Sequence, residues 1–276
     1  MDLQRIVIGV DFSPASVDAT RWAAQNFGRG VELILAHAVT LPEPTLAEGA
    51  TKRLQDLADS MSAERIRSEI REGNAARSLS DIATEVEADI LIVGARGERA
   101  DLDRAIGTTA QHVVRESTIP VLVVARPGGH PVSRILVPVD EDATARESLR
   151  WAGLLSNRFN AKVTTLHVDA TGAMSQAASP PNASQVTARA VSVDNEKTKR
   201  WSELARESGI PSDRVNSEEA VGVPAAEITA AAGRNGADII VMGRTAARSL
   251  RRAVLGSVTA TLLSDPPCSV LVVPAS

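Results

Sequence analysis

The sequence carries the same pattern twice, and this internal repeat strongly limits the folds that the chain can adopt. Residues 90–124 and 239–273 each read as an apolar strand, a glycine, a polar loop, and a Gly-Thr or Gly-Ser pair that opens a second apolar stretch. The two glycines that bound the loop are 13 positions apart in both copies. They are Gly94 and Gly107 in copy one, and Gly243 and Gly256 in copy two. A strand, a glycine loop and a helix start in this order are typical of a phosphate-binding loop.

Other landmarks recur in the same register outside this pattern. Residues 5–11 match residues 134–140, each a β-branched strand that ends in aspartate, and a tryptophan follows 11 positions later in both copies. A glycine and an aspartate 16 positions apart also recur. The paired landmarks are Asp11 and Trp22 with Asp140 and Trp151, His37 with His167, and Gly73 and Asp89 with Gly222 and Asp238. So many shared positions indicate an internal duplication.

The duplication predicts two domains of ordinary size. We expect domain one at 1–127 and domain two at 134–276, with a linker at 128–133, where proline and glycine mark a break between elements. Copy two is about twenty residues longer than copy one between its histidine and the next shared glycine. Most of the excess is small, polar and proline-containing, which predicts a surface loop insertion at about 171–190.

Strand-like and helix-like segments alternate along each copy, and this alternation predicts an α/β fold with a parallel, doubly wound sheet. We expect two tandem Rossmann-like domains, each a five-stranded parallel sheet flanked by helices. In copy one the expected strands lie near 5–10, 31–39, 65–71, 89–93 and 120–125, and the expected helices near 14–27, 45–62, 75–87 and 108–117. Aromatic residues make up only 2% of the chain, which suits a core of small aliphatic side chains around a parallel sheet.

Bulk composition narrows the class of protein. A hydrophobic share of 43% and a charged share of 23% are typical of a globular domain. The formal net charge of −4 argues against a general binder of nucleic acid or membrane surfaces. Cys268 is the sole cysteine, which excludes a disulfide framework within the chain and a cysteine metal cluster, and we expect it to pack before a buried strand. The apolar runs are strand-length and no targeting segment is recognised, so we expect a cytoplasmic protein.

Polar residues and glycines of copy one gather at strand ends. Asp11 ends the first strand and Gly94 the fourth, and ligands of doubly wound sheets bind beyond the carboxyl ends of strands where the strand order reverses. Gly107, Thr108 and Thr109 then open a helix whose free N–H groups favour an anion. Asp11 would face the other end of the ligand and accept from a ribose hydroxyl or an adenine amine. Together these residues predict a nucleotide lying across the crevice, if the two strands are neighbours.

Each feature alone also has a structural explanation. A Gly-x-x-Gly loop such as Gly94 to Gly97 is commonly a turn, an aspartate after a strand is often a helix cap, and Gly-Thr can simply start a helix. We expect Gly94 and Gly97 to permit positive φ and close backbone approach to the ligand. The joint occurrence of all these features at fixed spacing favours the ligand interpretation.

The pattern Gly-x2-Gly-x9-Gly-Thr resembles the universal stress protein domain, and the resemblance covers nearly the whole chain as two tandem domains. Gly94, Gly97, Gly107 and Thr108 fit this motif without departure. The resemblance implies an ATP-binding site in which adenine and ribose lie near Asp11. It also implies contacts from the backbone after the histidine of the second strand, which is Ala38, and phosphates held by the glycine loop. That loop also carries Arg96.

Copy two departs from the motif because Ala246 replaces the second loop glycine. If that position needs positive φ, alanine would cost about 1 kcal/mol or more. The same loop carries four arginines and no acid, which favours an anion unless it is only a solvated basic surface. These arginines are Arg244, Arg248, Arg251 and Arg252. The residues that would form a second, degenerate site are Asp140, Val168, Gly243, Gly256 and Ser257.

No residue pattern in the chain points to catalysis or to a metal site. His37 and His167 end apolar strands, where a buried, hydrogen-bonded structural role is expected, and no histidine pair has metal-ligand spacing. A nucleophile elbow and a Walker-type phosphate loop are absent from the sequence, and Lys52 is the only lysine of copy one. We therefore predict no catalytic residue and a nucleotide that is held more than turned over.

The leading interpretation is a stress-response protein that binds ATP, AMP or ADP, with or without Mg²⁺, for regulation or protection. One alternative is a slow ATPase or nucleotidyl-transfer enzyme of the related adenine-nucleotide hydrolase fold, and another is an interaction scaffold without nucleotide. Residues 121–127 and 270–276 are strongly β-forming and would lie at sheet edges, which favour pairing. We expect the two domains to pair with each other and the whole chain to form a homodimer, without nucleic-acid or membrane partners.

Overall fold

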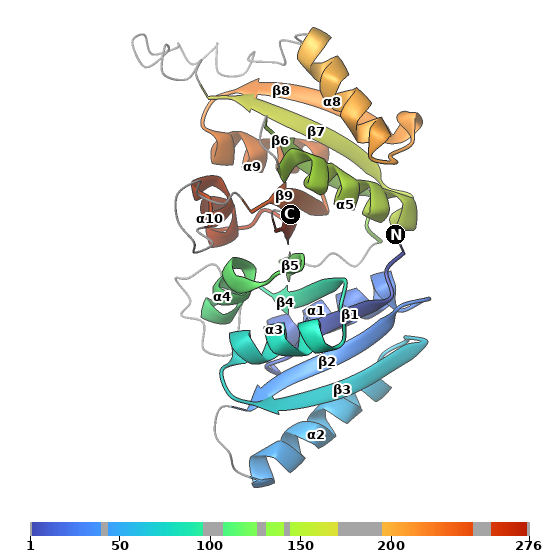
Figure 1. The fold of residues 1–276 in the computed structure, drawn as a ribbon, viewed down its shortest axis with the longest axis vertical. Coiled ribbons are helices and arrows are strands. Elements are labelled where there is room, and N and C mark those ends of the chain that lie inside the picture. Colours follow the sequence, from blue (N-terminus) through green and yellow to red (C-terminus); the bar gives the residue numbers. More distant parts are fainter. Residues whose placement is uncertain are drawn as a thin grey trace.

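Ten strands form one continuous sheet that carries helices on both faces (Figure 1). The computed structural model describes residues 2–39, 44–95, 107–125, 131–140, 144–170, 195–244 and 255–274. Copy one contains β1 (Arg5–Gly9), α1 (Pro14–Phe27), β2 (Glu32–Val39), α2 (Pro44–Asp59), β3 (Arg65–Glu72), α3 (Ala75–Glu85), β4 (Ile90–Gly94), α4 (Thr108–Glu116) and β5 (Val121–Val124). Copy two contains β6 (Arg134–Val139), α5 (Thr144–Phe159), β7 (Lys162–Asp169), α8 (Asn195–Glu207), the 3₁₀ turn η1 (Ser212–Arg214), β8 (Val215–Val221), α9 (Pro224–Asn235), β9 (Ile239–Gly243), α10 (Ser257–Ser264) and β10 (Ser269–Val273).

The strand order is β3-β2-β1-β4-β5-β10-β9-β6-β7-β8, so each copy contributes five parallel strands. The expected α/β fold with two doubly wound halves is confirmed, and the expected strands and helices of copy one agree with the observed bounds within three residues. Ser13 caps α1 and Pro14 takes its first position. The domain bounds at 127 and 134 stay a prediction, and half of the linker (128–130) and the whole predicted insertion lie outside the described residues.

Apolar side chains on the two faces of the sheet form two cores, and both cores run through the two copies. Helices α1, α2, α5 and α8 pack on one face, where Trp22 and Trp151 are buried. Helices α3, α4, α9 and α10 cover the other face, where Val114 of copy one and Val270 of copy two join the same core. The two tryptophans that recur in the sequence therefore occupy equivalent core positions.

The two halves meet where β5 pairs with β10, the one antiparallel pair of the described sheet. Leu122 stands opposite Leu271 in this pair, and their exposed fractions are 1% and 0%. The hydroxyl of Ser269 lies 3.3 Å from the carbonyl oxygen of Ala125 and donates to it. The expected pairing of the two domains within one chain is confirmed, and it moves both strands from the edge of a domain to the centre of the molecule (Figure 1).

Two arginines of copy two reinforce this junction by donating to carbonyl groups of copy one. Nη2 of Arg158, near the end of α5, donates to the carbonyl oxygens of Phe27 at 3.2 Å and Arg29 at 2.8 Å, where α1 ends. Nη1 of Arg244, directly after β9, lies within 3 Å of three carbonyl oxygens at the end of α4. Burial lowers the pKa of both guanidinium groups, and an arginine remains protonated even so. The terminal carbonyls of two helices thus receive cationic donors.

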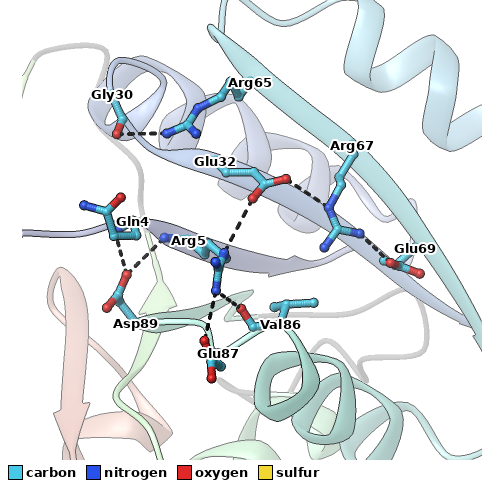
Figure 2. Close-up of polar contacts among 10 residues, drawn as sticks. All are labelled: Gln4, Arg5, Gly30, Glu32, Arg65, Arg67, Glu69, Val86, Glu87 and Asp89. Carbon is cyan, nitrogen blue, oxygen red and sulfur yellow. Dashed lines mark hydrogen bonds and ion pairs between the residues drawn. The ribbon is translucent and has the colours of Figure 1, made fainter.

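Charged side chains hold the amino ends of β1, β2 and β3 in register (Figure 2). Glu32 lies between two arginines, with Arg67 Nε at 3.0 Å and Arg5 Nε at 3.7 Å. One oxygen of Asp89 accepts from the backbone N–H groups of Gln4 at 2.6 Å and Arg5 at 3.0 Å. In copy two, Asp238 accepts in the same way from Ser133 and Arg134. The aspartate that recurs in both copies therefore joins the starts of two neighbouring strands.

The junction makes the stability of the two copies interdependent. We expect Leu271→Ala to lower the free energy of unfolding by about 2–5 kcal/mol, because it leaves a cavity in a core that both copies share. The matched control is Val223→Ala, since Val223 is 64% exposed and a change there should stay within about 0.5 kcal/mol. Urea unfolding followed by circular dichroism measures both values. Equal losses for the two variants would contradict a buried junction.

Candidate functional site

The carboxyl ends of β1 and β4 lie side by side, which is the arrangement that the candidate site requires. Ile8 of β1 is in register with Ile92 of β4, while β2 lies on the other side of β1. The strand order therefore reverses between β1 and β4, and a crevice at this edge is where doubly wound sheets bind ligands. Asp11 follows β1 and Gly94 ends β4, so the structure brings both residues to the same edge.

Asp11 has a local structural partner as well as a position at the carboxyl edge of the sheet. Its Oδ1 accepts from the backbone N–H of Ser13 at 3.0 Å, and the Ser13 hydroxyl in turn accepts from the N–H of Ser16 at 3.2 Å. The carboxylate is half-buried. These bonds hold the carboxylate at the start of α1 and leave it in contact with solvent, so the helix-cap interpretation and the ligand interpretation are compatible for this residue.

The residues around Asp11 are held by aromatic and cationic contacts. Phe12 has a φ of 62°, a left-handed conformation that is rare for a bulky residue. Its ring lies 4.7 Å from the ring of His37, and the guanidinium of Arg53 lies 3.9 Å above it. Nδ1 of His37 donates to the carbonyl oxygen of Val10 at 2.7 Å. Ala38 follows on β2 and is half-buried beside this cluster.

Both recurring histidines are hydrogen-bonded to a neighbouring strand end, as expected, but each is half-buried rather than buried. His37 is bonded to the end of β1, and Nδ1 of His167 lies 3.2 Å from the carbonyl oxygen of Val139 at the end of β6. The ring of His167 also stacks on Trp201 of α8 at 6.1 Å. Among the described residues, no group of three or more His, Cys, Asp or Glu side chains is arranged to hold a metal ion.

Gly94 is required for packing rather than for an unusual backbone conformation. Its φ lies outside the left-handed range, so the expectation of positive φ is wrong at this position. A Cβ there would stand 3.0 Å from the carbonyl oxygen of Ala15 and 3.2 Å from the nitrogen of Ser16, in the first turn of α1. Gly243 has the same relation to Thr144, whose hydroxyl would lie 2.1 Å from the added Cβ. In both copies this glycine lets a helix start approach the strand end.

Gly107 joins the two ends of the glycine loop and begins α4. Its N–H donates to the carbonyl oxygen of Ala95 at 2.8 Å, and the N–H of Ala95 donates to Val124 of β5 at 2.9 Å. Gly107 is the N-cap, with ordinary extended dihedrals of −68° and 150°, and provides no side-chain cap. Thr108 is exposed and Thr109 half-buried in a first turn without acidic residues. The start of α4 therefore presents uncapped N–H groups that suit an anion.

The remaining residues of both glycine loops, 96–106 and 245–254, are not among the described residues. In copy one, Arg96 and Gly97 lie outside the described residues, as do the departure Ala246 and the arginines Arg248, Arg251 and Arg252 in copy two. Their predicted contacts with phosphate stay predictions.

Copy two has the same strand neighbours and the same kind of helix start as the copy-one site, and its aspartate is more exposed. Strands β6 and β9 are neighbours, as β1 and β4 are. Asp140 is exposed, whereas Asp11 is half-buried, and Val168 of β7 is half-buried. Gly256 is an N-cap with dihedrals of −58° and 150°, and Ser257 starts α10 without a side-chain cap or an acidic residue.

Arg244 is the first residue of the basic loop in copy two, yet its guanidinium binds carbonyl groups of α4. This contact escaped the sequence analysis because its partners lie more than 120 residues away in the chain. In the sequence, an arginine directly after an apolar strand was the only available signal. Cys268 packs in the core just before β10, as expected. In the described part of the chain no helix is long and apolar enough to cross a membrane.

Comparisons with known proteins agree with this geometry. The family model for the universal stress protein family matches residues 2–125 and 131–274. Universal stress protein MJ0531 of Methanocaldococcus jannaschii is 28% identical over 150 residues, which span 54% of this chain and 86% of that protein. Universal stress protein Rv1996 of Mycobacterium tuberculosis is 24% identical over 59% of this chain, and the match spans only 62% of that relative. A crystal structure of a universal stress protein from Archaeoglobus fulgidus shares the fold, with a TM-score of 0.75 and 19% identity over 99% of this chain and 98% of that one.

The role of Gly94 in packing predicts a loss of stability that two glycine variants can reveal. We expect Gly94→Ala to lower the free energy of unfolding by about 1–3 kcal/mol, because the added methyl group meets backbone atoms of α1. Gly49→Ala in α2 is the control, since nothing lies within 4 Å of its added Cβ and alanine favours a helix by up to about 1 kcal/mol. Thermal unfolding should give shifts of opposite sign. A stabilised Gly94→Ala protein would contradict the packing role.

Proposed function

Because the chain belongs to the universal stress protein family, we propose that its first copy binds an adenine nucleotide at the crevice between β1 and β4. The observation that carries the proposal is the position of the α4 start. Its uncapped N–H groups lie next to Gly94, because Gly107 is bonded to Ala95. Asp11 lies at the end of the neighbouring strand. An anion site and a carboxylate at one sheet edge suit the two ends of a nucleotide.

The phosphate end of the nucleotide would lie at α4. Backbone N–H groups at a helix start bind phosphate without a lysine, and the hydroxyl of Thr108 would add a donor. The first turn of α4 contains no acidic residue that would repel the ligand. The phosphates and water would provide most ligands of a Mg²⁺ ion that accompanies ATP, as is usual for nucleotide-bound magnesium.

The adenosine end would lie at Asp11 and the backbone after His37. A carboxylate accepts from ribose hydroxyls or from an adenine amine, and its bond to Ser13 fixes its orientation before the ligand binds. Ala38 has a small side chain, so its backbone N–H and carbonyl would be accessible to the base. The contacts of Phe12 with His37 and Arg53 support this end of the crevice.

We propose one nucleotide per chain, with copy two as a modified partner. At the corresponding positions of copy two, Asp140 is exposed and Ala246 replaces a loop glycine. The guanidinium of Arg244 binds α4. The chain carries neither a nucleophile elbow nor a Walker-type phosphate loop. We therefore propose a regulatory or protective output that follows nucleotide occupancy. Steady phosphate release that disappears in Gly97→Val would instead favour the slow ATPase.

The homodimer expected from the sequence stays a prediction. The strands that favour pairing, β5 and β10, are already paired within the chain. The outer strands of the described sheet are β3 and β8, so a dimer would need one of these edges or a helical face. Sedimentation equilibrium at micromolar concentration measures the mass directly, and a mass of one chain would exclude the homodimer.

Nucleotide binding predicts an order among three variants. We expect Asp11→Ala to weaken ATP binding about tenfold, because it removes the carboxylate that would accept a hydrogen bond from the ribose or the adenine. Gly107→Val should weaken binding to a similar extent, because its side chain would crowd the start of α4. Asp140→Ala is the matched control in copy two and should change the affinity by less than about twofold. Isothermal titration calorimetry gives the dissociation constants and the stoichiometry.

Measurements on the wild-type protein alone also test the proposed nucleotide binding. Mass spectrometry of the ligand released from native protein should identify one adenine nucleotide per chain. Absence of any binding to ATP, ADP or AMP would reject the nucleotide site and favour the interaction scaffold. A larger effect of Asp140→Ala than of Asp11→Ala would reject copy one as the principal site.

A further inference from the structure

Arg244 of copy two holds the far end of the helix that would bind phosphate in copy one. Its Nη1 lies 2.9 Å from the carbonyl oxygen of Val114, 2.7 Å from that of Arg115 and 2.9 Å from that of Ser117. These carbonyls end α4, which has nine residues. Such a helix is about 13 Å long. One short rigid element therefore connects the Arg244 contacts with the uncapped N–H groups at Thr108.

The contact is asymmetric between the two copies. By the shared register, Ala95 of copy one occupies the position of Arg244, and an alanine side chain has no donor for the end of α10. Arg158, the other arginine that donates across the junction, also belongs to copy two, whereas its counterpart Arg29 is exposed. Copy two thus provides both arginine contacts to helices of copy one. The arginines of copy two therefore contact the copy whose candidate site has the intact glycine motif.

The Arg244 contact has a physical consequence for an anion at α4. A helix of nine residues is marginal on its own, so its packing contacts fix its position. The buried side chains of Ala110, Val113 and Val114 hold one side of α4, and the guanidinium holds its last carbonyls. A cation at the carboxyl end also stabilises the helix dipole. A fixed helix keeps its first N–H groups in the orientation that a phosphate needs.

We propose that Arg244 is a positioning residue for the phosphate end of the copy-one nucleotide site, supplied by copy two. This inference rests on the proposed function and adds a role for the second copy. Arg244 does not touch the nucleotide. It acts through α4, so it affects the affinity for phosphate-bearing ligands and leaves the adenosine end at Asp11 unchanged.

The test compares ATP with adenosine as probes of the full-length protein. We expect Arg244→Gln to weaken ATP binding about three- to tenfold, the usual range for a residue that acts through an intervening element. Adenosine affinity should stay within about twofold of the wild-type value. Arg244→Lys keeps the cation and should restore part of the ATP affinity. Isothermal titration calorimetry with both ligands gives the ratio of the two affinities, which a general loosening of the fold would not change.

Hydrogen exchange of the ligand-free protein measures the helix itself. Arg244→Gln should speed the exchange of backbone amides in α4, while amides in α10 keep the wild-type rate. Arg150→Gln is the matched control, because it removes the same charge from an exposed arginine of copy two that pairs with Glu147 on its own helix. It should change neither the exchange nor the affinities.

The outcomes separate the two proposals. A wild-type protein that binds no nucleotide rejects the proposed function. A wild-type protein that binds ATP while Arg244→Gln keeps the same affinity overturns the positioning role. Equal losses of ATP and adenosine affinity also overturn it, because they indicate only a structural contribution. A selective loss for ATP with faster exchange in α4 supports it.

Discussion

The antiparallel pairing of β5 with β10 connects the two copies of the fold. It joins two five-stranded sheets into one, and it makes both apolar cores continuous between the copies. Leu122 and Leu271 stand opposite each other in this pairing, and both are buried in the core that the two copies share. The junction also brings the carbonyl ends of α1 and α4 within reach of arginines from copy two.

The two copies differ in exposure and in contacts despite their common fold. Copy one has a half-buried aspartate at the crevice, an uncapped α4 start, and helices held at their far ends by Arg158 and Arg244. Copy two has the same strand neighbours, but Asp140 is exposed and its loop begins with an arginine that binds the other copy. Under the proposed function, copy one would hold the nucleotide and copy two would support that site within the same chain.

Several residues that recur in the sequence have structural explanations that a pattern cannot distinguish from functional ones. Asp89 and Asp238 accept from the starts of neighbouring strands, and His37 and His167 bond to strand ends. Gly94 was expected to use its conformational freedom, yet its φ is ordinary and the missing Cβ makes room for α1. A sequence shows that a side chain must be small, but whether a ligand or another helix fills the space depends on packing.

The amino-acid sequence was enough to predict the duplication, the order of strands and helices, the bounds of these elements in copy one within three residues, and the residues at the strand ends. These properties can be predicted because hydrophobic periodicity and glycine spacing are visible within short stretches of sequence. Tertiary structure decided which strands are neighbours at the crevice, why Gly94 is small, and where Arg244 donates. These contacts join residues tens to more than a hundred positions apart, and only packing of the folded chain specifies them.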